Sequence, residues 1–446
     1  MATALCRLLR NRGVRVAPFK AQNMSNNSYP CQAGGEIGRS QVTQARACGL
    51  LPEAAMNPVL LKPCGDSRSQ VIVHGKVWRT LDARDYYEHI PYLRQCALDA
   101  YEDLAARFDV VVMEGAGSVA ELNLASRDFV NLSMARAVGA RALLVADIER
   151  GGVFASILGT LDLLDPQDRA LVNCFAVNRF RGDRSLFDDG VRILEQRSGI
   201  PCLGVFPFTA EIQLDAEDSL SDNYKGPPLN VAIVRFPRIS NTTDFRFLGG
   251  ATKVDRPVHH QFDFVILPGT KSTLADLAWL RASGLDEWVH NQYAAGAHII
   301  GICGGYQMLG DSIRDPHGVD GPPAECAGLG LIRAGTLMSA RKTTVARAAR
   351  TSGGSAFRGY EIHMGQTEVE PGLRPFAVLE DGSHEGVRDG RITGTYLHGA
   401  LESPDVFREI FGFAPVAEGS PDQEMDALAR WLELDSDAGV LSRLIA

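Results

Sequence analysis

Short apolar runs recur along the chain and alternate with longer segments of mixed polarity. The runs are rich in valine and isoleucine: VRVAPF (14–19), FDVVVM (108–113), ALLVAD (142–147), LVNCFAVN (171–178), CLGVFPF (202–208), LNVAIVRF (229–236), FDFVILP (262–268) and HIIGIC (298–303). Nearly continuous runs of this kind are typical of parallel strands covered on both faces. Helix-like segments such as 86–107 and 273–281 separate many of them. The pattern predicts an α/β fold with open parallel sheets.

The alternation is interrupted at YKGPPLN (224–230), where a glycine and two prolines precede a fresh strand. A chain of 446 residues is too long for a single hydrophobic core. We therefore expect two domains, 1–225 and 229–446.

The first 35 residues contain five basic side chains and no acidic one. Such a start is compatible with a transit peptide. The same residues also predict a helix, 2–12, and a strand, 14–19. We favour the second interpretation, because the stretch that follows belongs to a longer motif described below.

The amino-acid composition excludes several classes of protein. Apolar residues make up 45% and charged residues 22%, which is typical of a globular protein. The net charge of -9 argues against a nucleic-acid-binding surface. No apolar run approaches the ~18 residues that span a bilayer, so no membrane partner is expected. Nine cysteines without a CxxC pair indicate a reducing compartment, which predicts a cytoplasmic protein and excludes a zinc ribbon.

Cys303 lies between an apolar run and two glycines in IIGICGGYQMLG (299–310). HIIGI predicts a buried strand and GGYQMLGDSI a helix, so Cys303 occupies a sharp strand-to-helix turn with small neighbours. The helix start favours a thiolate, and the following N–H groups can bind an oxyanion. A free cysteine is more often a small buried hydrophobe, which suits Cys174 or Cys202. For Cys303 the setting indicates a nucleophile at the carboxyl end of a strand.

A thiol nucleophile needs a base. Two histidines stand out: His398, at the end of ITGTYLHG (392–399), and His363, within GYEIHMG (359–365). Spacing alone leaves both open. A second loop after a strand, in FVILPGTKST (264–273), could complete an oxyanion hole with the N–H groups of Gly269 and Thr270.

LPGTKST, GICGGYQMLG and the late histidine, in this order, resemble a class I glutamine amidotransferase domain. The resemblance implies hydrolysis of L-glutamine through a Cys303 thioester, with His398 rather than His363 as the base. It implies an oxyanion hole at Gly269 and Gly304. Many such domains carry an acidic residue two positions after the histidine, where this chain has Ala400, and Glu402 is two further on. The third member of the site therefore stays unassigned.

Polar residues also end several strands of the N-terminal half. They are Lys20 in VAPFKAQNMSNNS, Glu114 in DVVVMEGAGS, Asp147 in ALLVADIERGG and Asn178 in AVNRFRGD. Each could belong to an ordinary turn, but four at one sheet edge indicate a site. A carboxylate such as Glu114 beside a backbone-rich loop suits a Mg²⁺ ion that itself holds phosphates.

Longer stretches resemble the cobyric acid synthase family from residue 18 to residue 399. They are PFKAQNMSNNSY, GGEIGRSQ, MNPVLLKP, VVMEGAGSVAELNL, VADIERGGVFASILGTL, VNRFRGD, PRISNTTDF, GICGGYQMLG, GYEIHMG and GTYLHG. The resemblance implies two α/β domains, one similar to dethiobiotin synthetase with a P-loop-type fold, the other a class I glutamine amidotransferase. It implies amidation of the b, d, e and g carboxylates of adenosylcobyrinic acid a,c-diamide in cobalamin synthesis, with ATP forming an acyl phosphate that ammonia attacks.

The resemblance also implies roles for single residues. Lys20 would contact phosphate or the substrate carboxylate, Asp147 and Asn178 would serve ATP or substrate binding, and Glu36 and Glu114 would hold Mg²⁺.

The family begins with a strand and a glycine-rich loop ending in Gly-Lys-Ser/Thr, and this sequence contains no such loop. We expect the true start to lie upstream; the alternative is a fragment with glutaminase activity only. Another amidoligase acting on a different carboxylate, or a non-enzymatic ATP switch of the partition type, are further alternatives. A switch should show no glutaminase activity.

Overall fold

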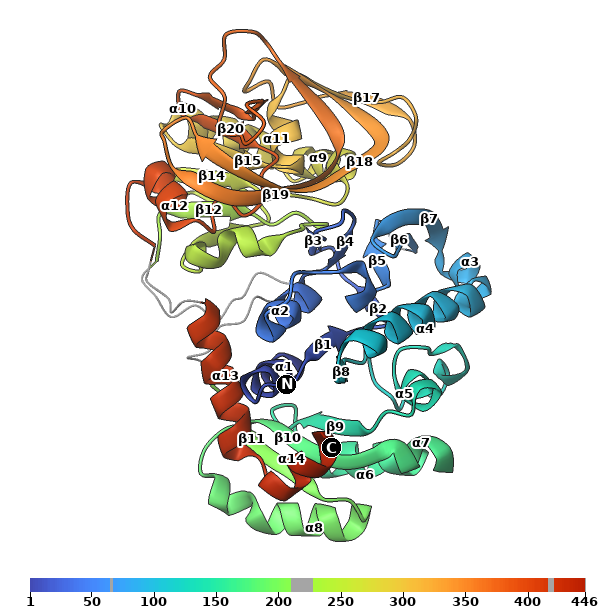
Figure 1. Ribbon diagram of the computed structural model, residues 1–446. Helices are drawn as coiled ribbons and strands as arrows, with labels where there is room; N and C mark the ends of the chain where they lie inside the picture. Colours follow the sequence, from blue (N-terminus) through green and yellow to red (C-terminus); the bar gives the residue numbers. More distant parts are fainter. Residues whose placement is uncertain (65–66, 210–227, 416–420, 446) are drawn as a thin grey trace.

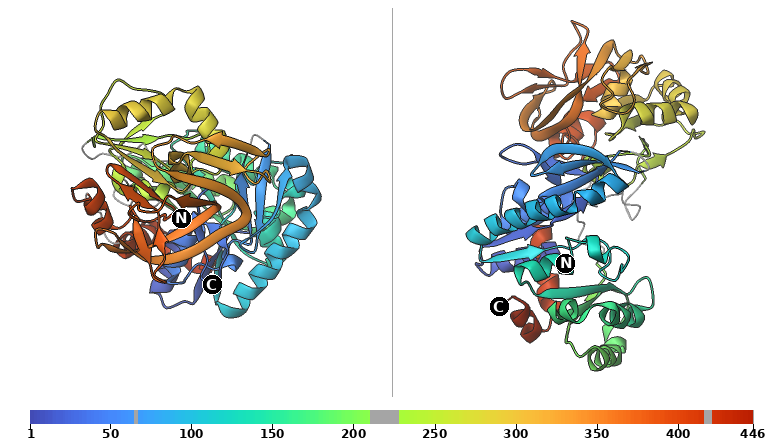
Figure 2. Two further views of the ribbon diagram at one scale, coloured as in Figure 1. Left: turned by 90° about the horizontal axis from the view of Figure 1, so that it is seen from above. Right: turned by 90° about the vertical axis from the view of Figure 1, so that its right-hand side faces the viewer.

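The computed structural model describes residues 1–64, 67–209, 228–415 and 421–445. The chain forms three lobes stacked along one axis, and both side views show the same order (Figures 1 and 2). The N-terminal half makes the middle and lower lobes, and residues 228–415 make the upper lobe. Most of the predicted interruption, 224–230, lies outside the described residues.

The middle lobe is built on a parallel pair of strands, β1 and β8. Beside it lie a four-stranded sheet, in the order β2-β5-β6-β7, and the antiparallel pair β3-β4. The strands are β1 (Val16–Phe19), β2 (Gln22–Met24), β3 (Ser28–Pro30), β4 (Glu36–Gly38), β5 (Val59–Pro63), β6 (Arg68–Val73), β7 (Lys76–Asp82) and β8 (Val110–Met113). The helices are α1 (Ala2–Asn11), α2 (Arg39–Cys48), α3 (Ala83–Glu88), α4 (Ile90–Arg107) and α5 (Leu132–Val138).

The lower lobe is a three-stranded parallel sheet in the order β11-β10-β9. Its elements are β9 (Ala142–Asp147), α6 (Val153–Leu163), α7 (Pro166–Leu171), β10 (Val172–Phe180), α8 (Asp188–Ser198) and β11 (Cys202–Pro207). Two further helices, α13 (Pro421–Asp435) and α14 (Ala438–Ile445), pack against this lobe and against α1. Arg7 pairs with Asp426 at 2.7 Å across that contact. Residues 421–445 thus join the N-terminal half in space, although the predicted second domain, 229–446, includes them.

The upper lobe contains a six-stranded sheet in the order β13-β12-β14-β15-β23-β22, parallel except for β22. Its strands are β12 (Val231–Val234), β13 (Thr252–Val254), β14 (Phe264–Leu267), β15 (His298–Ile302), β22 (Val387–Asp389) and β23 (Ile392–Thr395). Its helices are α9 (Thr273–Ala282), α10 (Leu285–Ala294), α11 (Gly304–Leu309) and α12 (Pro404–Phe411). Since parallel strands end at one edge, the segments after β12, β14, β15 and β23 meet there.

A second sheet of the upper lobe was not predicted. It contains β16 (Ser312–Asp315), β17 (Ala324–Ala327), β18 (Ala334–Thr351), β19 (Ala356–Val369), β20 (Ala377–Leu379) and β21 (His384–Glu385). The predicted helix from GGYQMLGDSI is correspondingly shorter, because the chain is extended at Gly310 before β16 begins. The long strand β19 reaches the edge where β23 ends, and there Tyr360 forms an antiparallel bridge with His398.

All eight predicted apolar strands form, and the predicted helix 273–281 corresponds to α9. The predicted helix 86–107 is divided into α3 and α4, since Pro91 begins a new helix near His89. Among the described residues, no helix combines the length and the apolar character needed to cross a membrane.

Candidate active site

Cys303 lies in the turn between β15 and α11. Its φ of 50° and ψ of −108° are strained for a residue with a side chain. The turn is tight: a Cβ at Gly301 would meet Leu309 at 2.7 Å, and one at Gly305 would collide with the carbonyl of Leu267. Small residues are therefore required on both sides of the thiol, as in other strained nucleophile turns.

His398 follows β23 and is completely buried. Its Nδ1 donates to Oδ2 of Asp244 at 2.7 Å, while Oδ1 of Asp244 accepts the N–H of Gly399 at 2.6 Å. Asp244 is itself buried, in the 3-10 helix η4 (Thr242–Leu248). A carboxylate on Nδ1 fixes the ring orientation and makes Nε2 the nitrogen available to a nucleophile.

The charge state of His398 depends on its partners. Burial lowers its pKa, but the charge and hydrogen bond of Asp244, together with Cys303, raise that pKa to about 10. Sγ of Cys303 donates to the carbonyl of Ile362 at 3.5 Å. The ring of Tyr360 stacks on His398 with 5.2 Å between centroids. Cysteine, histidine and aspartate thus form a contiguous buried group.

His363, the other candidate base, has different partners. Its ring stacks on Tyr396 at 3.8 Å between centroids, and its Nδ1 bonds the carbonyl of Gly365 at 2.7 Å. Tyr396 in turn bonds Gln307 and Thr367. The carboxylate nearest to His363, that of Glu361, lies 3.9 Å from its Nε2. His363 therefore belongs to the wall of the site, while His398 has a carboxylate hydrogen-bonded to its Nδ1, as a catalytic base needs.

The predicted oxyanion residues lie at the same place. A Cβ at Gly269 would meet Cε1 of His398 at 2.9 Å, and one at Gly304 would meet Cγ2 of Thr270 at 2.5 Å. The N–H of Gly305 donates to the carbonyl of Pro268 at 3.1 Å. The loop after β14 and the start of α11 are thus held together next to Cys303.

The predicted synthetase residues fall into separate groups. Lys20, after β1, pairs with Glu114, after β8, at 3.0 Å. Glu114 also accepts a hydrogen bond from Gln44. In the lower lobe, Asp147 and Asn178 are register partners at the ends of β9 and β10. Lys20 and Glu114 therefore share one sheet edge, and Asp147 and Asn178 share another.

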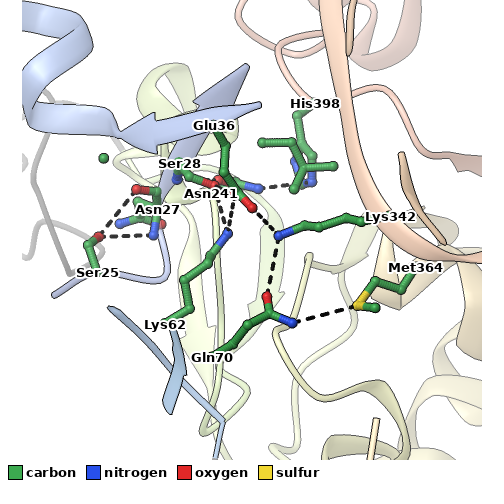
Figure 3. Close-up of polar contacts among 12 residues, drawn as sticks. Ser25, Asn27, Ser28, Glu36, Lys62, Gln70, Asn241, Lys342, Met364 and His398 are labelled. Atoms are coloured by element: carbon green, nitrogen blue, oxygen red, sulfur yellow. Dashed lines mark hydrogen bonds and ion pairs between the residues drawn. The ribbon is translucent and has the colours of Figure 1, made fainter. Parts of the chain in front are cut away.

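Glu36 lies apart from these residues, in the contact between the middle and upper lobes (Figure 3). Its buried carboxylate pairs with Lys62 at 2.8 Å and with Lys342 of the upper lobe, and it accepts the hydroxyl of Ser28 at 2.7 Å. Burial raises the pKa of Glu36. The charges and hydrogen bonds of Lys342 and Lys62 have the larger, opposite effect, so the pKa of Glu36 lies well below its usual range. Burial lowers the pKa of Lys342 to about 7.

Two family models match this chain. A family model described as a CobQ/CobB/MinD/ParA nucleotide binding domain matches residues 1–221. A second, described as a CobB/CobQ-like glutamine amidotransferase domain, matches residues 230–406.

Curated relatives match nearly the full length. Proteins named cobyric acid synthase are 40% identical in Dehalococcoides mccartyi strain CBDB1, over 99% of this chain and 93% of the relative, and 45% identical in Jannaschia sp. strain CCS1, over 98% and 95%. One from Mycobacterium ulcerans is 47% identical over 92% of this chain and 85% of the relative. The chain belongs to the cobyric acid synthase family.

Membership of the cobyric acid synthase family confirms the predicted family and fold class. It also confirms the predicted class of enzyme, a glutamine-dependent amidoligase. The match to a nucleotide binding domain confirms that the N-terminal half has a nucleotide-binding fold.

Two residues of the site were not assigned from the sequence, Asp244 and Asn241. Both lie in PRISNTTDF (237–245), one of the stretches that resemble the cobyric acid synthase family. Asn241 places its Nδ2 3.1 Å from Nε2 of His398. A polar stretch after a buried strand is a signal that could have indicated these two residues. Nothing in the sequence, however, shows that this stretch contacts a histidine so far along the chain.

The two carboxylates expected to hold Mg²⁺ each have other partners in this structure. Glu36 is bound by two lysines and Glu114 by Lys20 and Gln44. No cluster of three or more aspartate, glutamate, histidine or cysteine side chains suited to a metal occurs in the described ranges.

Proposed function

We propose that this chain uses ATP and L-glutamine to amidate the b, d, e and g carboxylates of adenosylcobyrinic acid a,c-diamide, in a reducing compartment such as the cytoplasm. The observation that carries the proposal is the buried group Cys303–His398–Asp244, joined to a nucleotide-binding half in one chain. All nine cysteines are free, as a thiol nucleophile and a reducing compartment require.

In the glutaminase step, Sγ of Cys303 attacks the carboxamide carbon of glutamine, and its proton passes to Nε2 of His398. N–H groups of Gly269 and Gly304 bind the oxyanion. The tetrahedral intermediate expels ammonia with the proton from Nε2, leaving a thioester on Cys303. Water, deprotonated by Nε2, then attacks the thioester carbon; glutamate is released, and the thiolate of Cys303 leaves and recovers its proton from Nε2. Asp244 keeps the proton on Nδ1 throughout and stabilises the imidazolium.

In the synthetase step, a substrate carboxylate attacks the terminal phosphorus of ATP, and ADP leaves. Ammonia then attacks the acyl carbon, phosphate leaves, and the ammonium proton passes to solvent. A free carboxylate is a poor electrophile, so phosphorylation supplies the leaving group. Lys20 is a suitable partner for phosphate charge, and Asp147 and Asn178 are proposed contacts for ATP. Mg²⁺ binding by Glu36 and Glu114 remains a prediction, and no step here depends on it.

A cavity of about 810 Å³ beside the Lys20–Glu114 edge is the proposed place for the corrinoid. Its wall includes Gln22 and Met24, just after Lys20, and Ala116 and Gly117, just after Glu114. Aromatic and apolar side chains such as Tyr86 line the rest together with charged ones such as Arg127 and Arg136. A bulky macrocycle held there would present a peripheral carboxylate to the phosphate site.

Two variants test the division of labour. Cys303→Ala should abolish glutamine-dependent amidation but retain amidation driven by high ammonium concentration, because only the ammonia source is removed. Lys20→Met should retain glutamine hydrolysis and lose amidation with either nitrogen source. Mass spectrometry of the corrinoid product, and glutamate release, measure the two steps. Glutamine-dependent amidation by Cys303→Ala would contradict the role of Cys303.

A further inference from the structure

Asn241 joins the catalytic histidine to the other half of the molecule. Its side chain is buried between His398 of the upper lobe and Ser28 of β3 in the middle lobe (Figure 3). Oδ1 accepts the backbone N–H of Ser28 at 3.1 Å, and Nδ2 lies 3.1 Å from Nε2 of His398. A single carboxamide thus contacts both halves of the enzyme.

The contact with Ser28 fixes which way the carboxamide faces. A backbone N–H can only donate, so the oxygen of Asn241 must face Ser28 and the NH₂ group must face His398. Nδ1 of His398 already donates to Asp244. The contact with Asn241 therefore requires an unprotonated Nε2 that accepts its hydrogen bond, against the effect of Asp244 and Cys303, which raise the pKa of His398.

That hydrogen bond competes with catalysis. The in-plane lone pair of Nε2 can hold one proton, and catalysis requires it for the proton of Cys303. The thiol, for its part, is shared between the carbonyl of Ile362 at 3.5 Å and the imidazole of His398, whose pKa it raises by a hydrogen bond. If Nε2 became protonated, its N–H would face the N–H of Asn241, donor against donor. The carboxamide consequently opposes formation of the thiolate–imidazolium pair.

We propose that Asn241, held by Ser28, keeps the glutaminase site inactive until the segment 25–28 shifts and withdraws the carboxamide from Nε2 of His398. The enzyme then hydrolyses glutamine only when its synthetase half is ready for ammonia. This inference rests on the proposed function of Cys303 and His398. It assigns a positioning residue that couples the two halves.

The surroundings of Ser28 supply a route for such a shift. The segment 25–28 lies in the chain between Lys20 and Glu36, and the hydroxyl of Ser28 bonds both Glu36 and Lys62. Asn27 accepts the N–H of Thr242, the neighbour of Asn241, at 3.3 Å. A substrate that binds to the synthetase half and shifts the side chain of Lys62 or Glu36 therefore moves the residues that hold Asn241.

Asp244 and Cys303 make the effect of release predictable. They raise the pKa of His398 in spite of its burial, so Asn241 opposes the charge state that these two residues favour, and its withdrawal removes that opposition. An alternative role for Asn241, in which it merely orients His398, predicts the opposite sign for its removal.

Two substitutions at this position separate the roles. Asn241→Gly deletes the carboxamide without backbone strain, because Asn241 has φ 54° and ψ 50°, a conformation that glycine adopts freely. Asn241→Asp keeps the acceptor for Ser28 but replaces the donor by a carboxylate, which holds a proton on Nε2 away from Sγ. Asn230→Gly is the matched control: Asn230 is exposed and precedes β12, at the opposite edge of the same sheet.

The experiment measures glutamate release without ATP or corrinoid, and the rate of Cys303 alkylation by iodoacetamide at pH 7, located by peptide mass spectrometry. Asn241→Gly should raise both about fivefold to tenfold, the effect of one hydrogen bond. Asn241→Asp should lower glutamate release below wild type, and Asn230→Gly should change neither quantity. Ammonium-driven amidation reports whether each variant is folded.

Glutamate release by Asn241→Gly at or below the wild-type rate would overturn the proposal. If that variant does not fold, release by Asn241→Asp at or above the wild-type rate overturns it. Equal glutamine hydrolysis by wild type and Cys303→Ala would instead overturn the proposed function itself, so the two failures can be told apart.

Discussion

Asp244 and His398 are separated by 154 positions in the chain, yet Oδ2 of Asp244 accepts a hydrogen bond from Nδ1 of His398 at 2.7 Å. The carboxylate comes from the segment after β12, whereas the histidine follows β23. The position two residues after the histidine, Ala400, is buried and apolar. The orienting carboxylate thus comes from a different strand end than the histidine and contacts the imidazole from there.

Asp244→Asn should lower the glutaminase kcat by at least about 100-fold, because an amide can hold His398 in the wrong tautomer. The second contact of Asp244, with the N–H of Gly399, can still be accepted by the amide oxygen. Glutamate release measures the effect, with ammonium-driven amidation unchanged.

Asp255→Asn provides the control for this change, since Asp255 is an exposed aspartate of the same lobe. It should behave as wild type. A kcat for Asp244→Asn within a few-fold of wild type would show that Asp244 does not orient the base.

Glu385 makes stability depend on pH. It is buried beneath β23, where it accepts hydrogen bonds from the hydroxyl of Thr395 at 2.7 Å and the N–H of Tyr396 at 2.6 Å. Burial, opposed by these hydrogen bonds, raises its pKa to about 7. The folded state therefore holds a proton that the unfolded state releases near pH 4.5. Stability from this group is fully present below that pH and falls as pH rises to about 7.

Glu385→Gln removes the titration and keeps the shape, because its carbonyl can accept from Tyr396 while its NH₂ donates to Thr395. Wild type should lose about 3 kcal/mol relative to the variant between pH 4.5 and 7.5. Urea unfolding across that range measures the difference. A constant difference in the free energy of unfolding would show that Glu385 is ionised throughout.

The parallel strands and the nucleophile could be predicted from the sequence because each has a local sequence signal. A Val/Ile-rich run predicts its own strand, and glycines beside Cys303 follow from the space that its turn requires. Asp244 and Asn241 could not be placed from local pattern, since their roles depend on which strand ends the topology brings to one edge. The position of Glu36 could not be predicted for the same reason, because its partner Lys342 lies in a hairpin 306 positions away in the chain.

The long hairpin β18–β19 was missed for a different reason. Its residues alternate between buried and exposed positions and include many charged side chains, unlike the continuous apolar runs that indicate parallel strands. One face packs on the lobe and the other is solvated. The residues of β19 that approach Cys303 and His398 belong to this sheet, so the wall of the site was the least predictable part of it.

The ion pair of Arg39 and Glu402 should stabilise the contact between the halves. Arg39, at the start of α2, lies 3.1 Å from Glu402, with side-chain exposures of 3% and 17%. Glu402 also accepts the hydroxyl of Thr243 at 3.0 Å, next to Asp244. Arg39→Met leaves the carboxylate of Glu402 mostly buried and without its cation. The free energy of unfolding should fall by about 3–5 kcal/mol.

The double variant Arg39→Met/Glu402→Gln tests whether the loss comes from the pair. Because it removes both charges, it should be more stable than Arg39→Met alone, although it carries one more substitution. Arg408→Met is the control: its partner Asp405 lies at 3.0 Å, but both side chains are exposed, so its loss costs about 0–1 kcal/mol. Urea unfolding followed by tryptophan fluorescence compares the variants. If the effects of Arg39→Met and Glu402→Gln simply added, the two side chains would act independently, and the contact between the halves would depend on packing instead of charge.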